Sequence, residues 1–276
     1  MPAWQPVALG LGAAACWGSA DFLAKAEAER DGAEAALFWL YLIGFPCFLA
    51  AAAVFGHGLP APRGLGVWAA AGVLNAAAYL LLYRGFRVGL LSVVTTTNAA
   101  WATVTVILAA VFLGETPAPG AMAGIGLTLV GVVLVANPGG GFKLRSPGFR
   151  EGAGAALFFG ASFFLLRLPV AAGDPLVQAA VLRGIGLPVV GGWLRVAGHD
   201  FRAFRKRPPV FGFLDSAGFL CFVVGLSLGE AYLVAPLGSL LTPVAVALSA
   251  IFYHERLRPH QWAGFGLTVA GAVWLA

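Results

Sequence analysis

Charged and hydrogen-bonding side chains inside otherwise apolar stretches are the residues of this sequence that could do chemistry. Asp215 stands in "GFLDSAGF", and 140 residues earlier Asn75 stands in the similar "GVLNAAAY". If these stretches cross a membrane, an Asp at mid-depth costs about 2.5–3.5 kcal/mol on insertion scales, so it normally faces protein or water. We interpret Asp215 as a substrate contact or a proton site. The alternative is an acid buried by hydrogen bonds as a packing device.

Two further charged residues lie in apolar stretches. Asp21 is a second proton-site candidate, although it stands four residues before Lys25 and could simply form an ion pair with it along one helix face. Arg183 lies near the middle of its stretch. It either neutralises an acid or attracts an anionic substrate group, and the alternative is a hydrogen bond to carbonyl groups that only stabilises the helix.

Other polar and aromatic residues complete the set that could line a cavity. The run Thr95-Thr96-Thr97-Asn98 is polar enough to do so, although Ser and Thr hydroxyls also bond to their own helix. Four aromatic residues could stack on a substrate or serve as packing and interface anchors. The candidates for substrate binding are Trp17, Asp21, Asn75, Tyr79, Thr97, Asn98, Trp101, Ser162, Arg183, Asp215 and Tyr232, with Asp215 and Asp21 also candidates for proton coupling.

The composition indicates the solvent in which these residues work. Hydrophobic residues make up 60% of the 276, the mean hydropathy is +0.87, and only 11% are charged. Soluble proteins have about a quarter of their residues charged, so a membrane is the natural solvent. The net charge of +5 could suggest nucleic acid. Basic residues of membrane proteins, however, gather in cytoplasmic loops, so we expect a lipid bilayer and no nucleic acid as partner.

No motif for a cofactor or a metal is present. The four histidines stand in expected loops without metal-ligand spacing, and "GIG" and "GFG" lack the strand and the full fingerprint of a nucleotide loop. The three cysteines lie in apolar stretches and are expected to be reduced. We therefore expect no cofactor, no metal and no catalytic residues. A membrane-embedded enzyme would need clustered His, Asp or Cys.

Apolar segments separated by charge, Pro and Gly clusters predict an all-α membrane protein with ten transmembrane helices. A span needs about 20 mostly apolar residues. Lipid leaves backbone polar groups no partner outside the chain, which favours helices. The expected spans are 5–25, 33–55, 65–85, 90–113, 118–136, 151–171, 175–197, 209–228, 231–253 and 259–276.

The ten spans fall into two similar halves. At a shift of 140, residues 110–136 and 250–276 are identical at twelve of 27 positions, and at a shift of 142, residues 10–25 and 152–167 are identical at seven of 16. "GFP" at 44–46 meets "GLP" at 186–188. Five spans is an odd number, so the second half must enter the membrane from the opposite side. The sequence thus predicts two inverted five-helix repeats, 1–137 and 151–276, joined by a linker at 138–150.

Two duplicated features near the ends of the halves have structural interpretations. Glu115 and Glu255 occupy the same repeat position, each in a turn just before a span that begins near a proline, so we expect each to cap the following helix. The pairs Gly124–Thr128 and Gly264–Thr268 are small-xxx-small patterns that favour close contact between helices.

Basic residues indicate the orientation. Fourteen of the 17 Lys and Arg lie in the loops of one side, and after the duplicated "GH" the first half has one basic residue whereas the second has four. The positive-inside rule then places that side in the cytoplasm and both termini outside. The expected location is the inner cell membrane, crossed many times.

The chain resembles the EamA-type transporters of the drug/metabolite transporter superfamily. The motifs that carry the resemblance are "CWGSADFLAK" (16–25), "LTPVAVALSAIFYHE" (241–255) with its counterpart ending "VFLGE" (111–115), and the glycine-rich span after each glutamate. The resemblance implies a ten-helix carrier whose central cavity is lined by spans one, three, four, six, eight and nine. That family is usually described with cytoplasmic termini, whereas the charges here indicate the reverse. Its small multidrug members carry a glutamate in the first span, which "GLGAAACWG" lacks.

The expected function is that of a secondary transporter, not an enzyme, which moves small polar metabolites such as amino acids by alternating access, with export as the expected direction. The alternatives are a non-transporting interaction or lipid-handling protein and a membrane-embedded enzyme. The partners would be a small-molecule substrate and the lipid bilayer, with monomer and homodimer both open.

Overall fold

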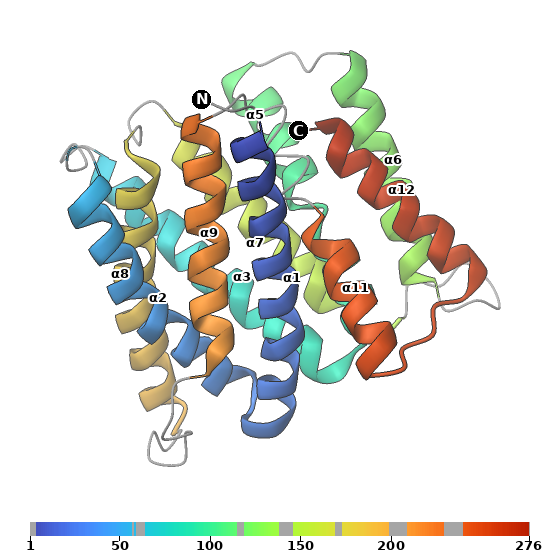
Figure 1. Ribbon diagram of the computed structural model, residues 1–276, viewed down its shortest axis with the longest axis horizontal. Helices are drawn as coiled ribbons and strands as arrows, with labels where there is room; N and C mark the ends of the chain where they lie inside the picture. Colours follow the sequence, from blue (N-terminus) through green and yellow to red (C-terminus); the bar gives the residue numbers. More distant parts are fainter. Residues whose placement is uncertain are drawn as a thin grey trace.

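The computed structural model describes residues 4–56, 58, 64–114, 119–137, 146–168, 173–198, 209–228 and 240–275, and these residues form helices and no strand (Figure 1). The all-α expectation is therefore confirmed for the part of the chain described. The helices are α1 (Trp4–Asp31), α2 (Ala33–Phe55), α3 (Leu65–Val88), α4 (Leu91–Asn98), α5 (Trp101–Leu113), α6 (Pro119–Ala136), α7 (Phe149–Arg167), α8 (Pro175–Val196), α9 (Val210–Leu228), α11 (Leu241–Phe252) and α12 (Pro259–Leu275).

The helices are those of a protein that crosses a membrane several times. Six stretches among the described residues are long and apolar enough to span it: Gln5–Asp31, Ala33–Phe55, Leu65–Val88, Leu91–Leu113, Phe149–Leu166 and Pro175–Val196. Shorter apolar helices cover Met122–Val135, Val210–Gly225 and Leu241–Phe252, inside three more of the expected spans. Many large apolar side chains point outward from these helices, which suits a lipid surface and not water.

The first helix is longer than the expected span 5–25, because α1 continues to Asp31. Its last turns are held by ion pairs along the helix, Lys25 with Glu29 at 2.9 Å and Glu27 with Arg30 at 2.6 Å. Opposite charges three or four residues apart stabilise a helix, and they let it continue beyond its apolar part.

The fourth expected span, 90–113, is interrupted. Here α4 ends at Asn98, and α5 begins at Trp101 after a two-residue turn. The amide of Ala100 bonds to the carbonyl of Thr97 at 3.2 Å, the tighter pattern of a 3₁₀ turn. Thr and Asn favour such a break because β-branching and side-chain hydrogen bonds compete with the regular helix. The polar run thus ends one helix segment inside the protein.

Corresponding helices of the two halves begin at corresponding residues. The starts of α2 and α8 are 142 residues apart, and those of α5 and α11 and of α6 and α12 are 140 apart. Packing follows the same exchange: α1 packs on α9 as α3 packs on α7, and α1 packs on α11 as α7 packs on α5. In Figure 1, α2 and α8 lie side by side and run in opposite directions, and so do α6 and α12.

Helices α6 and α12 form a closely packed pair at one side of the bundle (Figure 1). A Cβ added at Gly264 would lie 2.6 Å from the carbonyl oxygen of Gly131, and one added at Gly271 would lie 2.7 Å from that of Gly124. No real Cβ approaches a backbone oxygen so closely, so only glycine permits this contact. The small-residue patterns on the two helices therefore do bring the backbones together, as the sequence indicates.

Glu255 does cap a helix, but not the one expected. Its carboxylate accepts hydrogen bonds from the amides of Leu91 and Ser92 at 2.8 and 3.1 Å and from the Ser92 hydroxyl at 2.8 Å. These amides are at the start of α4, whereas the expected partner was the following helix, α12. A carboxylate at a helix N-terminus satisfies free amides and complements the helix dipole. Glu115, its repeat counterpart, lies outside the described residues.

We predict that Gly264→Ala lowers the thermal unfolding midpoint of the detergent-solubilised protein, because overpacking a tight contact costs about 1–3 kcal/mol. The matched control is Gly266→Ala on the same helix, since a Cβ at Gly266 meets nothing within 4 Å. Equal midpoints for the two variants would contradict close packing of α6 on α12.

Candidate functional site

A buried ion pair joins α8 and α9 near the middle of the bundle. Arg183 Nη2 donates a hydrogen bond to Asp215 Oδ2 at 2.5 Å, and the two side chains are only 7% and 9% exposed. Removing two charges from water costs several kcal/mol for each ion, and a direct, charge-assisted hydrogen bond offsets part of that cost. The two charged residues that the sequence places in separate apolar stretches are therefore partners.

Tyr79 of α3 connects this ion pair to the other half of the chain. Its hydroxyl donates to Asp215 Oδ1 at 3.1 Å and accepts from Arg183 Nη2 at 3.2 Å. The Tyr79 ring stacks edge-to-face on Phe159 of α7, with the ring centroids 4.8 Å apart. Helices α3, α7, α8 and α9 therefore meet at one set of polar atoms.

A second polar pair repeats the first in neutral form. Tyr41 of α2 donates from its hydroxyl to Asn75 Oδ1 of α3 at 3.0 Å. Tyr41 and Arg183 are 142 residues apart, and Asn75 and Asp215 are 140 apart, the two shifts of the repeat. Asn75 and Asp215 make no hydrogen bond to each other that the described residues record. They are linked through Tyr41, whose ring centroid lies 5.0 Å from the Arg183 guanidinium.

Aromatic rings surround the Arg183 guanidinium. Besides Tyr41, the ring centroids of Tyr79 and Phe48 lie 4.7 and 5.7 Å from its central carbon, distances that allow cation–π attraction. Gly44 makes room for it, because a Cβ there would lie 3.2 Å from Arg183 Nε. The second terminal nitrogen, Nη1, is buried and has no hydrogen-bond partner among the described residues.

α1 brings a second carboxylate to this region. Asp21 is half-buried and has no hydrogen bond or ion pair among the described residues. It does not pair with Lys25, because Lys25 Nζ donates to the carbonyls of Phe86 and Gly89 at 2.8 and 2.9 Å and also binds Glu29. These carbonyls end α3, so Lys25 caps that helix and leaves Asp21 unpaired.

Trp17 stands one turn before Asp21 on α1. Its Nε1 donates to the backbone carbonyl of Asp215 at 3.2 Å, and its ring lies 5.4 Å from that of Phe222, centroid to centroid. Trp17 therefore orients the backbone of α9 next to the ion pair.

The polar run on α4 divides into two parts. The hydroxyls of Thr95 and Thr96 bond back to carbonyls of their own helix at 2.8 and 2.6 Å. Those of the next two residues are not used in this way: Thr97 Oγ1 and Asn98 Oδ1 are buried without a hydrogen-bond partner among the described residues. Two unsatisfied polar atoms thus lie where the helix is interrupted, a place where an unsatisfied group calls for an explanation.

The remaining candidates differ in position. The Trp101 ring lies 4.7 Å from that of Phe163, centroid to centroid. Ser162 is fully buried and donates to the Ala71 carbonyl at 2.9 Å, so its hydroxyl is used in packing α7 on α3. Tyr232 lies outside the described residues.

Sequence reasoning overlooked Tyr41. A tyrosine in an apolar stretch is usually read as an interface anchor, so its type alone was no signal. The signal available was the repeat, because the shift that aligns "GFP" with "GLP" also aligns Tyr41 with Arg183. Their glycine neighbours behave alike: Gly44 makes room for Arg183, and a Cβ at Gly186 would collide with the Tyr41 ring.

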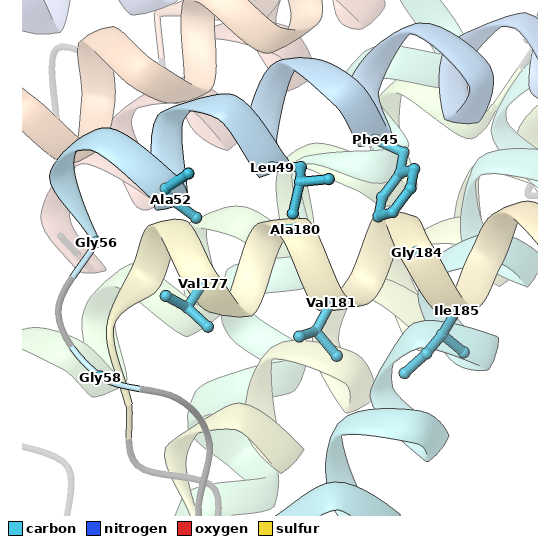
Figure 2. Close-up of a pocket in the computed structure, with 11 residues that line it drawn as sticks. Phe45, Leu49, Ala52, Gly56, Gly58, Val177, Ala180, Val181, Gly184 and Ile185 are labelled. Carbon is cyan, nitrogen blue, oxygen red and sulfur yellow. The ribbon is translucent and has the colours of Figure 1, made fainter.

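A groove of about 610 Å³ lies between α2 and α8, away from these polar atoms (Figure 2). Its lining consists of apolar side chains and glycines: Phe45, Leu49, Ala52, Ala53, Gly56, Gly58, Val177, Ala180, Val181, Gly184 and Ile185. Such a surface has no group to orient a polar solute, so the groove is not the polar site. The described residues also contain no cluster of three His, Cys, Asp or Glu that could hold a metal ion.

We predict that Tyr79→Phe destabilises the protein, because the change leaves polar atoms of a buried ion pair without a partner, at a cost of about 1–3 kcal/mol. Tyr83→Phe is the matched control, one turn further along α3: Tyr83 is buried, but its hydroxyl has no hydrogen bond among the described residues. Thermal unfolding in detergent measures both variants. A midpoint for Tyr79→Phe no lower than that for Tyr83→Phe would remove the Tyr79 hydroxyl from the network.

Comparisons with known proteins place this arrangement. A model of the "EamA-like transporter family" matches residues 4–137 and 152–276. A solved structure titled "Crystal structure of protein" aligns with a TM-score of 0.57 at 18% identity, over 98% of this chain and 97% of that chain, which is a likeness of fold alone. A search of curated proteins gave no match. Since the family model covers nearly the whole chain, the protein is a multi-pass membrane protein of the EamA-like transporter family, within the drug/metabolite transporter superfamily.

Proposed function

We propose that the protein is a secondary transporter that carries small polar metabolites, amino acids or related solutes, across the cytoplasmic membrane by alternating access. The observation that carries this proposal is the Arg183–Asp215 ion pair with Tyr79. It joins helices of both halves through buried polar atoms. Ionisable groups inside a membrane are costly, and they mark substrate and ion pathways in transporters.

Two inverted repeats of five spans would supply the alternating motion. The matched helix starts and the opposite directions of α2 and α8 and of α6 and α12 support this arrangement (Figure 1). Two inverted copies of one fold can exchange conformations, and the exchange turns a cavity open on one side into one open on the other. Ten spans in all, with the halves divided at 138–150, follow from the same proposal.

The substrate site in this proposal lies between α1, α3, α4 and α9. Asp21, Tyr79 and Asn98 belong to different helices and are each partly exposed inside the bundle. The break after α4 adds free polar atoms, as discontinuous helices do at the binding sites of other transporters. Asp215 and Asp21 are the acids that could couple transport to protons.

The proposed orientation puts the ends of α1, α3 and α11 at the cytoplasmic face and both termini outside. The distribution of Lys and Arg in the sequence supports it, because basic loops stay in the cytoplasm. Export is the proposed direction of net flux, out of the cell through the inner membrane.

Uptake into liposomes containing the purified protein tests the proposal. We expect at least one labelled amino acid or related metabolite to accumulate above the level in protein-free liposomes. Asp215→Asn should lose most of that uptake, about tenfold or more, because it removes a charge whose partner stays buried. Asp31→Asn, at the exposed end of α1, is the control and should transport normally.

Two outcomes would contradict the proposal. If no solute of the panel accumulates although the reconstituted protein is folded, the transporter function fails. If Asp215→Asn transports as well as the unaltered protein with the same pH dependence, Asp215 has no part in the mechanism.

A further inference from the structure

The Arg183 guanidinium offers more hydrogen-bond donors than its present partners use. Nη2 binds Asp215 and the Tyr79 hydroxyl, whereas Nη1 is buried and has no hydrogen-bond partner among the described residues. A guanidinium has five N–H donors in a planar fork that matches a carboxylate with two parallel hydrogen bonds. The structure therefore holds a buried cation that makes one contact to a carboxylate where it could make two.

The ionisable groups around this cation come from every helix packed against α9. They are Asp21 of α1, Tyr41 of α2, Tyr79 and Tyr83 of α3, and Arg183 of α8, together with Asp215 itself. Tyrosines are neutral near pH 7. Arg183 is thus the one cation of this cluster in the part of the chain described, and it can neutralise one carboxylate at a time.

We propose that Arg183 binds the carboxylate of a monocarboxylate substrate in exchange for Asp215, and that the released Asp215 takes up one proton. This inference rests on the proposed transporter function and names its substrate class, which includes amino acids. The driving constraint is that a released Asp215 carboxylate would be a buried charge without a partner. Such a charge is so costly that the group becomes neutral instead.

The exchange conserves atoms and charge. Before it, Arg183 and Asp215 form a pair of net charge zero. After it, Arg183 and the substrate carboxylate form a pair of net charge zero, and Asp215 is a neutral carboxylic acid whose proton comes from the water on the side of entry. On the other side, Asp215 gives its proton to water and binds Arg183 again, which releases the substrate. One carboxylate therefore moves with one proton, and its own charge is cancelled.

The geometry favours a carboxylate over other charged groups. A phosphate carries more charge than one guanidinium neutralises, and phosphate sites in proteins usually add a helix N-terminus or a row of backbone amides. The described network has no such amides at Arg183. An organic cation would meet the positive charge of Arg183 first. Both remain outcomes that the experiment below detects.

The test measures binding to the full-length protein in detergent. Acetate, lactate, benzoate and L-leucine are each compared with their amides, and phosphate and benzylammonium are added as other charge types. The thermal unfolding midpoint reports binding, because a ligand stabilises the state that it binds. We expect at least one carboxylate to raise the midpoint when its amide does not. The inference is wrong if none does, or if only phosphate or benzylammonium stabilises the protein.

The two halves of the ion pair should respond in opposite ways. Asp215→Asn removes the internal competitor, so we expect the carboxylate to bind about tenfold more tightly, since charge pairs of this kind compete directly. Arg183→Gln should abolish carboxylate binding. Its matched control is Arg84→Gln, which breaks the more exposed pair with Glu34 and should leave binding unchanged. A purely structural ion pair would instead make both Asp215→Asn and Arg183→Gln lose binding, which would overturn the inference.

Proton uptake separates the exchange from simple anion binding. In weakly buffered solution near pH 7, binding should take up about one proton per carboxylate, so affinity rises as pH falls. Asp215→Asn should bind with no proton uptake, whereas Asp21→Asn should keep it. Carboxylate binding without proton uptake in the unaltered protein would refute the exchange.

Liposome uptake distinguishes this failure from failure of the proposed function. If the protein transports a labelled solute but binds no carboxylate, the transporter function stands and the inference falls. If Arg183→Gln or Asp215→Asn does not fold, Arg183→Lys replaces it: it keeps the charge but loses the fork, and carboxylate binding should weaken without disappearing.

Discussion

The hydrocarbon core of a membrane contains no water, and most of this structure follows from that one constraint. Every polar group placed inside the bundle must find its partner within the chain. The backbone meets the condition by forming helices throughout the described residues. Side chains meet it locally, as when Ser162 donates to the Ala71 carbonyl of α3, and Arg183 and Asp215 meet it by pairing. The few atoms that do not meet it, Thr97 Oγ1, Asn98 Oδ1 and Arg183 Nη1, are where function is to be sought.

The repeat supplies two equivalent positions for polar pairs, and the two halves fill them with different chemistry. In the first half the pair is Tyr41 with Asn75, which is neutral, and in the second it is Arg183 with Asp215, which is charged. Both acceptors stand on the third helix of their half. Tyr79 contacts the charged pair from the first half, so the centre of the bundle holds one cation beside neutral hydroxyls and an amide. A charge on both sides would have required a second partner that lipid cannot provide.

Long-range contacts also decide how the helix ends are satisfied. The sequence led us to pair Lys25 with Asp21 and Glu255 with the next helix, because local spacing shows only local partners. In the structure Lys25 caps the end of α3, and Glu255 caps the start of α4. Both partners are far away in the chain, and no periodicity marks them. The same limit explains why the sequence gave Asp215 and Arg183 as separate candidates and omitted Tyr41.

What the sequence determined by itself is the membrane setting, most helix boundaries and the existence of the repeat. These depend on local quantities: the length of apolar runs, the positions of Pro and Gly, and identities at a fixed shift. Only the tertiary structure decided that Arg183 binds Asp215, that Asp21 stays unpaired and that span four is interrupted next to unsatisfied polar atoms. The physical reason is that pairing depends on which helix faces meet. Packing across the whole bundle sets those faces, while any one apolar helix could turn several faces inward.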